Sequence, residues 1–246
     1  MVWPAGSRRG GGAARRRMTR PPVVYWPLAG PFLIAAVVGA VVLITLLQVG
    51  LLTYALGQLG VGPQATMLVL LASLLGGAVN IPVARLRSNV VQLEPYVSVF
   101  RIRYLVPVLR SRATVIAVNL GGALVPAALS AYLIAHDRLG WRALAAVAIV
   151  GVLVHLVARP VPGLGIAVPT LLPGLFAVLA VVVLHPVAMA GLAYVGGTLG
   201  TLAGADLANL HRVRQLGAPV ASIGGAGTFD GVFLAGIIAV LLAGLV

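Results

Sequence analysis

Two aspartates, Asp206 and Asp230, are the residues of this sequence best placed to do chemistry. The chain has four acidic residues among 246, and both of these aspartates border long uncharged, apolar stretches. A carboxylate in such surroundings is costly to keep charged, so it is usually paired, protonated or functional. Two neighbouring carboxylates can also share a proton, one acting as base and the other as acid. The pair therefore indicates proton coupling or acid–base catalysis, and the chain must supply elements that bring the two together.

Those elements are predicted to be membrane helices. The chain is 61% hydrophobic and 9% charged, with a mean hydropathy of +1.10, whereas soluble domains average about 25% charged residues. Several apolar stretches reach the length that a helix needs to cross a bilayer. We expect an all-α, polytopic membrane bundle of about seven transmembrane helices, in which residues 23–246 form a single transmembrane domain. The expected spans are 31–57, 65–84, 113–135, 143–158, 170–185, 187–210 and 229–246.

The arginines predict the orientation of these spans. All 17 basic residues are arginines, and 15 of them lie in the first 20 residues, between residues 85 and 112, or just after the fourth and sixth spans. Those positions share one side of the membrane, and only Arg138 and Arg142 fall on the other. By the positive-inside rule the N-terminus is cytoplasmic and the C-terminus outside. Topology thus explains the net charge of +13, and no nucleic-acid partner is expected, because no basic face is interleaved with aromatics.

The sequence also makes predictions for the N-terminal tail and for the segments between the spans. Residues 1–22 are rich in Arg and Gly and are predicted to be a disordered cytoplasmic tail, with Met18 as an alternative start and the first span as an uncleaved anchor. The long loop between spans 2 and 3 alternates around Val97–Arg103, which predicts a short β-hairpin on the inner surface. Two further inner segments, 159–174 and 217–229, are read either as binding-site loops or as plain linkers.

This topology brings five polar side chains to one depth. Asn80, Asn119, His155, Asp206 and Asp230 come from five different spans, and all fall within roughly 10 Å of the inner interface at 1.5 Å of rise per residue. Each one also has a structural reading: a helix cap for Asp230, pairing with an arginine for Asp206, interhelical hydrogen bonds for the asparagines and a satisfied neutral ring for the histidine. Their convergence is what indicates a binding site.

Glycines surround the two aspartates. Gly196, Gly200 and Gly204 form a stripe at four-residue spacing that would let another helix approach closely; if the last span packs there, Asp206 and Asp230 come close together. Gly227 and Thr228 precede Asp230 and are candidate binding residues beside it. His155, Asp206 and Asp230 are also a possible nitrogen and oxygen ligand set for zinc or manganese. No tight ligand spacing supports that set, and the sequence requires no cofactor.

The stretches AVNLGGALVPAALSAYL (117–133), RPVPGLGIAVP (159–169), GTLGTLAGADLANL (197–210) and GAPVASIGGAGTFDGVFLAGIIAVLLA (217–243) resemble a prokaryotic membrane family catalogued as domain of unknown function 1614. The likeness covers most of the chain from about residue 23. It implies a multi-pass protein of the prokaryotic cell membrane and carries no known activity. GAGTFD, which ends at Asp230, is more distantly similar to the Gly-x-Gly-Asp motif of intramembrane aspartyl proteases, but two residues separate its last glycine from the aspartate.

Three functions fit these observations. The first is a transporter or permease-like protein that binds a small solute or ion, with Asp206 and Asp230 coupling it to protons. The second is a non-catalytic membrane scaffold or sensor, and the third is an intramembrane aspartyl-type hydrolase. No cysteine, nucleotide-binding loop, zinc-protease motif or serine-hydrolase motif is present. The sequence therefore leaves open whether the protein is an enzyme, as well as the identity of its solute and its oligomeric state.

Overall fold

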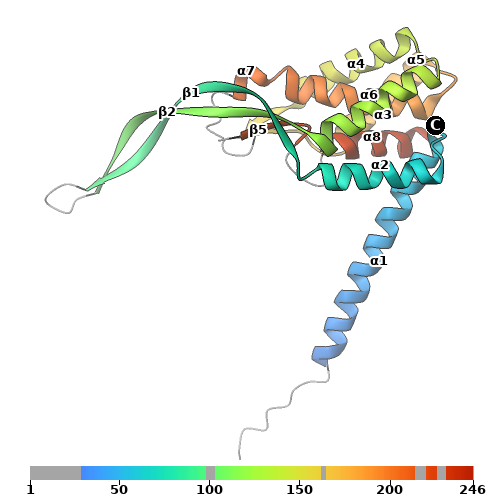
Figure 1. The fold of residues 1–246 in the computed structure, drawn as a ribbon, viewed down its shortest axis with the longest axis horizontal. Helices are drawn as coiled ribbons and strands as arrows, with labels where there is room; N and C mark the ends of the chain where they lie inside the picture. The colour runs from blue at the N-terminus through green and yellow to red at the C-terminus, as the bar shows by residue number, and fades with distance from the viewer. Residues whose placement is uncertain (1–28, 98–102, 162–164, 214–219, 226–230, 246) are drawn as a thin grey trace, which may run out of the picture. The chain divides into compact units, whose positions relative to one another are not determined.

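The structure is a computed structural model that describes residues 29–97, 103–161, 165–213, 220–225 and 231–245. It divides into two compact units, Met1–Leu47 and Gln48–Val246. The second unit combines a helical bundle with a three-stranded sheet, and its parts can be followed in Figure 1. The predicted tail, residues 1–22, lies outside the described residues.

The first helix, α1 (Ala29–Gln58), contains the one stretch among the described residues that is long and apolar enough to cross a membrane. That stretch is Ala36–Gln58, 23 residues long, and only Leu52, Ala55 and Leu56 within it are buried. The expected first span, 31–57, is therefore confirmed as a helix. The last turns of the helix belong to the second unit, where Leu52, Ala55 and Leu56 are part of the hydrophobic core.

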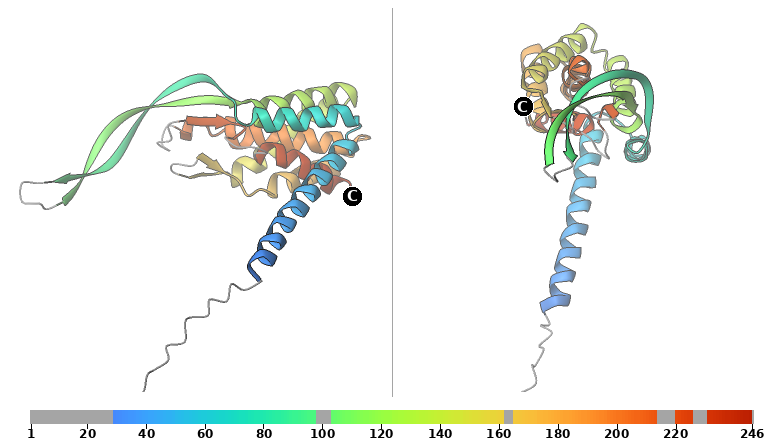
Figure 2. Two further views of the ribbon diagram at one scale, coloured as in Figure 1. Left: turned by 60° about the horizontal axis from the view of Figure 1, so that its bottom comes forward. Right: turned by 90° about the vertical axis from the view of Figure 1, so that its left-hand side faces the viewer.

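Helix α6 (Met189–Thr201) is the centre of the bundle. It packs against α3 (Val125–His136), α4 (Trp141–Val157), α5 (Leu172–Leu184) and α8 (Gly231–Ala243), while α2 (Pro63–Gly76) packs against α3. The right-hand view of Figure 2 looks along the bundle and shows the helices grouped around α6. Tyr194 and Leu192 of α6 and Phe233 of α8 are fully buried. Gly196 and Gly200, two members of the glycine stripe, are buried inside the bundle as well.

The sheet has the order β1–β2–β5. Strands β1 (Asn80–Val97) and β2 (Arg103–Asn119) form an antiparallel hairpin, and β5 (Val220–Ile223) pairs parallel with the end of β2 that adjoins the bundle. In Figure 1 the hairpin leaves the end of the bundle and runs on beyond the helices. A second, two-stranded sheet joins β3 (Arg159–Val161) to β4 (Gly165–Ala167) in the proline-rich segment.

Two short π-helices lie next to the sheet. The first, η1 (Leu120–Leu124), follows β2 and leads into α3, and the second, η2 (Leu202–Leu207), continues α6 and is followed by α7 (Leu210–Val213). Pro126 lacks the N–H that would bond back to Gly122, which removes one rung of the regular α-helix where η1 ends. Thr201 donates its hydroxyl to the carbonyl of Gly197, a bond that tends to bend a helix, at the point where η2 begins. Single π-turns of this kind often mark functional sites.

Two expected spans are wrong in extent. Within the expected span 65–84 the helix α2 ends at Gly76. The residues from Asn80 on form a strand that pairs with β2. The expected span 113–135 begins as a strand, and its helical part starts at Leu120. In both cases β-branched and apolar residues that read as membrane helix belong to a strand. Period alone does not separate a buried strand from a helix in a continuous apolar run.

The remaining expected helices have the right places. The spans 143–158, 170–185, 187–210 and 229–246 correspond to α4, α5, α6 with η2, and α8. The fold is therefore mainly helical with a small sheet, while a count of seven transmembrane helices is not confirmed. A hairpin was expected around Val97–Arg103, but its strands are 18 and 17 residues long, so the expectation that it is short is wrong.

Candidate functional site

The side chain of Asn119 connects the sheet to the neighbouring helices by hydrogen bonds. It is the last residue of β2, fully buried and directly opposite Asn80, the first residue of β1. Its Nδ2 donates to the carbonyl of Gly77 at 2.8 Å and to Oδ1 of Asn80 at 3.2 Å, while its Oδ1 accepts from the N–H of Gly122 at 2.6 Å. One amide side chain therefore holds the end of α2, the start of β1 and the first turn of η1 together.

A second set of contacts extends this arrangement to Asp206. The hydroxyl of Ser222, on β5, lies 2.6 Å from Oδ1 of Asn80 and 2.5 Å from the carbonyl oxygen of Gly225. The N–H of Gly224 donates to Oδ2 of Asp206 at 2.7 Å. Asn80, Asn119, Asp206, Ser222 and the Gly224–Gly225 turn thus form a hydrogen-bonded group, which we call the polar junction.

Glycine is required where the backbones of the polar junction meet. Gly224 and Gly225 both have φ of +81°, in the left-handed region that side chains disfavour. A Cβ on Gly122 would collide with the carbonyl oxygen of Gly224, and a Cβ on Gly121 would collide with the carbonyl oxygen of Ser73. The glycine pairs in GGALVP and SIGG therefore let three chain segments approach at backbone distance, which places Asp206 beside the turn.

His155 lies on a neighbouring contact. Its Nδ1 is 3.2 Å from Nδ2 of Asn209, and the same Nδ2 is 2.9 Å from the carbonyl of Gly204 and 3.0 Å from that of Ala205. Asn209 is fully buried, and its Oδ1 has no hydrogen-bond partner among the described residues. The amide ties α4 to η2, and its orphaned oxygen is a polar atom that water or a ligand must satisfy.

The glycine stripe of α6 packs against α4. A Cβ on Gly204 would collide with the carbonyl oxygen of Gly151, and a Cβ on Gly200 would lie 2.6 Å from Cβ of Val150. The close approach expected of such a stripe is confirmed, and the helix that makes it at Gly200 and Gly204 is α4 rather than the last span. Helix α8 instead packs against another face of α6, where Gly197 meets the backbone of Ala235.

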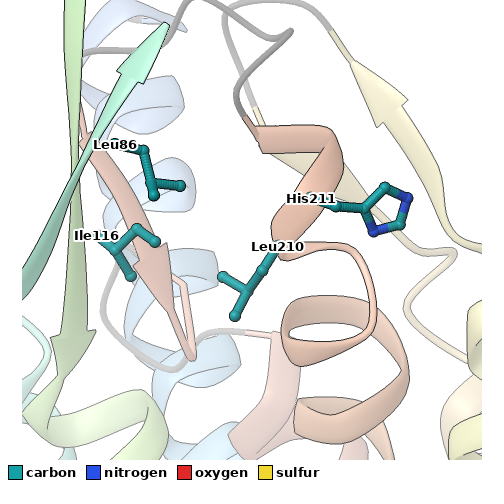
Figure 3. A pocket seen from close by; sticks show the side chains of 4 residues that line it. All are labelled: Leu86, Ile116, Leu210 and His211. Atoms are coloured by element: carbon teal, nitrogen blue, oxygen red, sulfur yellow. The ribbon is translucent and has the colours of Figure 1, made fainter.

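An apolar hollow lies between the sheet and α7. It has a volume of about 370 Å³ and is lined by Leu86, Ile116, Leu210 and His211. Figure 3 shows the side chains of Leu86 and Ile116 pointing from the strands toward Leu210, with the ring of His211 on the opposite side of the helix. The hollow borders the sheet that carries the polar junction, but it offers no charged group of its own.

The structure brings together three of the five residues predicted to share one depth. Asn80, Asn119 and Asp206 belong to the polar junction, and His155 contacts η2 through Asn209. Asn80 and Asn119 do so from strands, so the expectation that they lie on membrane helices is wrong. Asp230, Gly227 and Thr228 fall outside the described residues, and among those described no group of three or more His, Cys, Asp or Glu side chains is placed to hold a metal.

Two residues of the site were missed by sequence reasoning. Asn209 lies three positions after Asp206, a spacing that puts both on neighbouring positions of one helix face, and that signal was available. Ser222 precedes a Gly-Gly pair and contacts Asn80, 142 positions away in sequence. No local pattern indicates that contact, because it depends on β5 pairing with β2.

The described residues form a mainly helical bundle with one helix long and apolar enough to cross a membrane, and a partly buried polar junction lies where the small sheet meets two π-turns. The chain belongs to the family described as "Protein of unknown function (DUF1614)", whose family model matches residues 74–242. No curated protein and no solved structure matches the chain. The matched range includes every described residue of the polar junction.

Proposed function

We propose that this protein is a multi-pass protein of the cell membrane that binds a small solute or ion at the polar junction and couples it to protons through Asp206. In this proposal the N-terminus is cytoplasmic and about seven segments enter the bilayer. The lipid bilayer is the surrounding partner, and no nucleic acid is involved.

The surface of the bundle supports the membrane part of the proposal. Large apolar side chains point outward on most of its helices, with 75% of Leu144, 73% of Leu156 and 70% of Leu68 exposed. Soluble monomers rarely carry large contiguous apolar patches, whereas lipid-facing helices require them. The helices of 12 to 17 residues reach about 18–26 Å, short of the ~30 Å hydrocarbon core. The bilayer would have to thin locally around them.

Asp206 carries the functional part of the proposal. Its carboxylate lies in η2, where the regular hydrogen bonding of α6 gives way to a π-turn, and it accepts the N–H of Gly224 from a separate segment. Transporters commonly place substrate and ion sites where membrane helices are broken and the backbone is free to act as a ligand. A half-buried carboxylate at such a break can gain or lose a proton as the adjoining segments move.

Proton flux in liposomes tests this function. Purified protein is reconstituted with a pH-sensitive dye inside the vesicles, and inward gradients of Na⁺ or K⁺ are imposed at equal ionic strength. We expect an efflux of protons above that of protein-free vesicles, and we expect Asp206→Asn to abolish it, because the amide cannot exchange a proton. Asp137→Asn is the matched control: Asp137 contacts His136 at 2.8 Å beyond the end of α3, so flux should persist.

The outcomes separate the alternatives. Flux equal to that of protein-free vesicles under every gradient contradicts the transport proposal and favours the scaffold or sensor. Flux that survives in Asp206→Asn retains transport but removes Asp206 from it. Size-exclusion profiles of each variant show whether a loss of flux reflects a loss of fold.

A further inference from the structure

The hydroxyl of Ser222 lies within hydrogen-bond distance of two acceptor oxygens. Oδ1 of Asn80 lies 2.6 Å away and the carbonyl oxygen of Gly225 lies 2.5 Å away, both at hydrogen-bond distance. A serine hydroxyl carries one hydrogen. It can therefore donate to one of these oxygens, and the other approaches it with no proton between them.

Turning the Asn80 amide does not remove this shortage. The turn would present an NH₂ group to Ser222, but it would also set that group against Nδ2 of Asn119, which is 3.2 Å from the present Oδ1. The amide of Asn119 cannot turn in response, because its Nδ2 donates to Gly77 and its Oδ1 accepts from Gly122. The orientation of Asn80 is therefore fixed by its neighbours, and three oxygens converge on one hydrogen.

We propose that these three oxygens, Asn80 Oδ1, Ser222 Oγ and the Gly225 carbonyl, bind a sodium ion. Hard cations take oxygen ligands, and a positive charge supplies what the missing proton does not. The ligands are neutral, which suits a monovalent ion better than Mg²⁺ or Ca²⁺. The ion would move the oxygens slightly apart, and water would complete its shell, because Asn80 is exposed and Ser222 and Gly225 are only half-buried.

The position of this site links it to Asp206. Gly224, whose N–H binds Asp206, is the residue before Gly225, and both belong to the turn that follows β5. Ion binding at Gly225 would therefore act on the hydrogen bond that holds the carboxylate. Sodium as the coupled ion rests on the proposed transport function, whereas sodium binding itself is measured separately.

Thermal unfolding of the purified full chain is the test. We expect NaCl to raise the Tm by about 5 °C in a saturable manner relative to equal concentrations of KCl or choline chloride. Asn80→Ala and Ser222→Cys should lose this rise. Thr53→Ala should keep it, because the Thr53 hydroxyl bonds within its own helix. A thiol is a poor ligand for sodium and a good one for soft cations, so Cd²⁺ should stabilise Ser222→Cys but not the wild type.

These measurements either support or overturn the sodium site. An equal rise with KCl or choline, or a sodium effect that persists in both Asn80→Ala and Ser222→Cys, overturns the proposal. The cadmium measurement keeps it testable if Asn80→Ala fails to fold. Sodium binding without proton flux in liposomes would leave this inference standing and remove the transport function. Proton flux without sodium binding would overturn the sodium site and leave the transport function standing.

Discussion

Replacing Gly204 by alanine should destabilise the bundle through a clash of two backbones. The new Cβ would overlap the carbonyl oxygen of Gly151 and lie 2.9 Å from its carbonyl carbon and 3.0 Å from its Cα. Carbon atoms in contact prefer separations of about 3.5–4.0 Å, so α4 and η2 would have to separate by about 1 Å. No flexible side chain is available to move instead.

The expected loss follows from that separation. Overpacking a close-packed interface costs about 1–3 kcal/mol, and each kcal/mol lowers the Tm of a chain of this size by about 2–4 °C. We therefore expect a fall of about 2–12 °C, measured by fluorescence-detected size exclusion after heating. Two further substitutions grade the effect: a Cβ on Gly200 would lie 2.6 Å from Cβ of Val150, whereas one on Gly196 would lie 3.3 Å from the methyl of Ala146.

Gly50 provides the control. It lies within α1, and a Cβ there would meet nothing within 4 Å. Alanine is favoured over glycine in a helix by about 0.5–1 kcal/mol, so Gly50→Ala should be neutral or stabilising. A Tm for Gly204→Ala equal to that of Gly50→Ala would refute the packing of α4 on η2. An order other than Gly196, Gly200, Gly204 for increasing loss would refute the graded distances.

Further substitutions test the polar junction and the topology. Gly122→Ala should lower the Tm by several degrees, because its Cβ would meet the carbonyl of Gly224; an unchanged Tm would contradict that approach. Asn119→Ala should cost about 1–3 kcal/mol of stability, since it leaves buried polar partners unpaired, and a neutral effect would show that the amide does not hold the junction. Asp206→Asn should keep a Tm close to that of the wild type, because an amide oxygen still accepts the N–H of Gly224; unfolding would make the residue structural. Reporter fusions after residue 20 and after Val246 should report the cytoplasm and the outside, respectively, and a cytoplasmic C-terminus would remove the common-depth argument.

The helical part of the fold was predictable because its signal is local. The apolar stretches over α1, α4, α5, α6 with η2, and α8 are long, and their predicted ends agree with the structure to within a few residues. The sheet was less predictable. Asn80 and Asn119 sit in apolar runs that read equally well as helix, and their strand conformation depends on pairing with each other across 39 positions.

The candidate site was predictable in its members more than in its geometry. Asn80, Asn119 and Asp206 stood out because polar groups are rare in such a chain, and they do lie together. The sequence predicts that they meet because they lie at one depth on membrane helices, whereas Asn80 and Asn119 lie on strands. They meet because glycines at 121, 122 and 224 let η1, α2 and the turn after β5 approach at backbone distance, and such long-range contacts leave no periodic trace.

The opposing interpretations of Asp206, structural clasp and functional acid, make different demands on its surroundings. A clasp needs a partner for each carboxylate oxygen and nothing more, and asparagine would serve nearly as well. Here the carboxylate lies at a π-turn, next to a turn that needs two glycines in the left-handed conformation, and beside a serine with one proton for two acceptor oxygens. A clasp requires none of these features. The proposed ion site would use all three, because the turn supplies a backbone carbonyl as a ligand, the glycines allow the close approach of the segments, and the shared hydroxyl proton leaves room for a positive charge. These three features support the proposed ion site at the polar junction, and the sodium and proton-flux measurements decide between that site and a fixed structural contact.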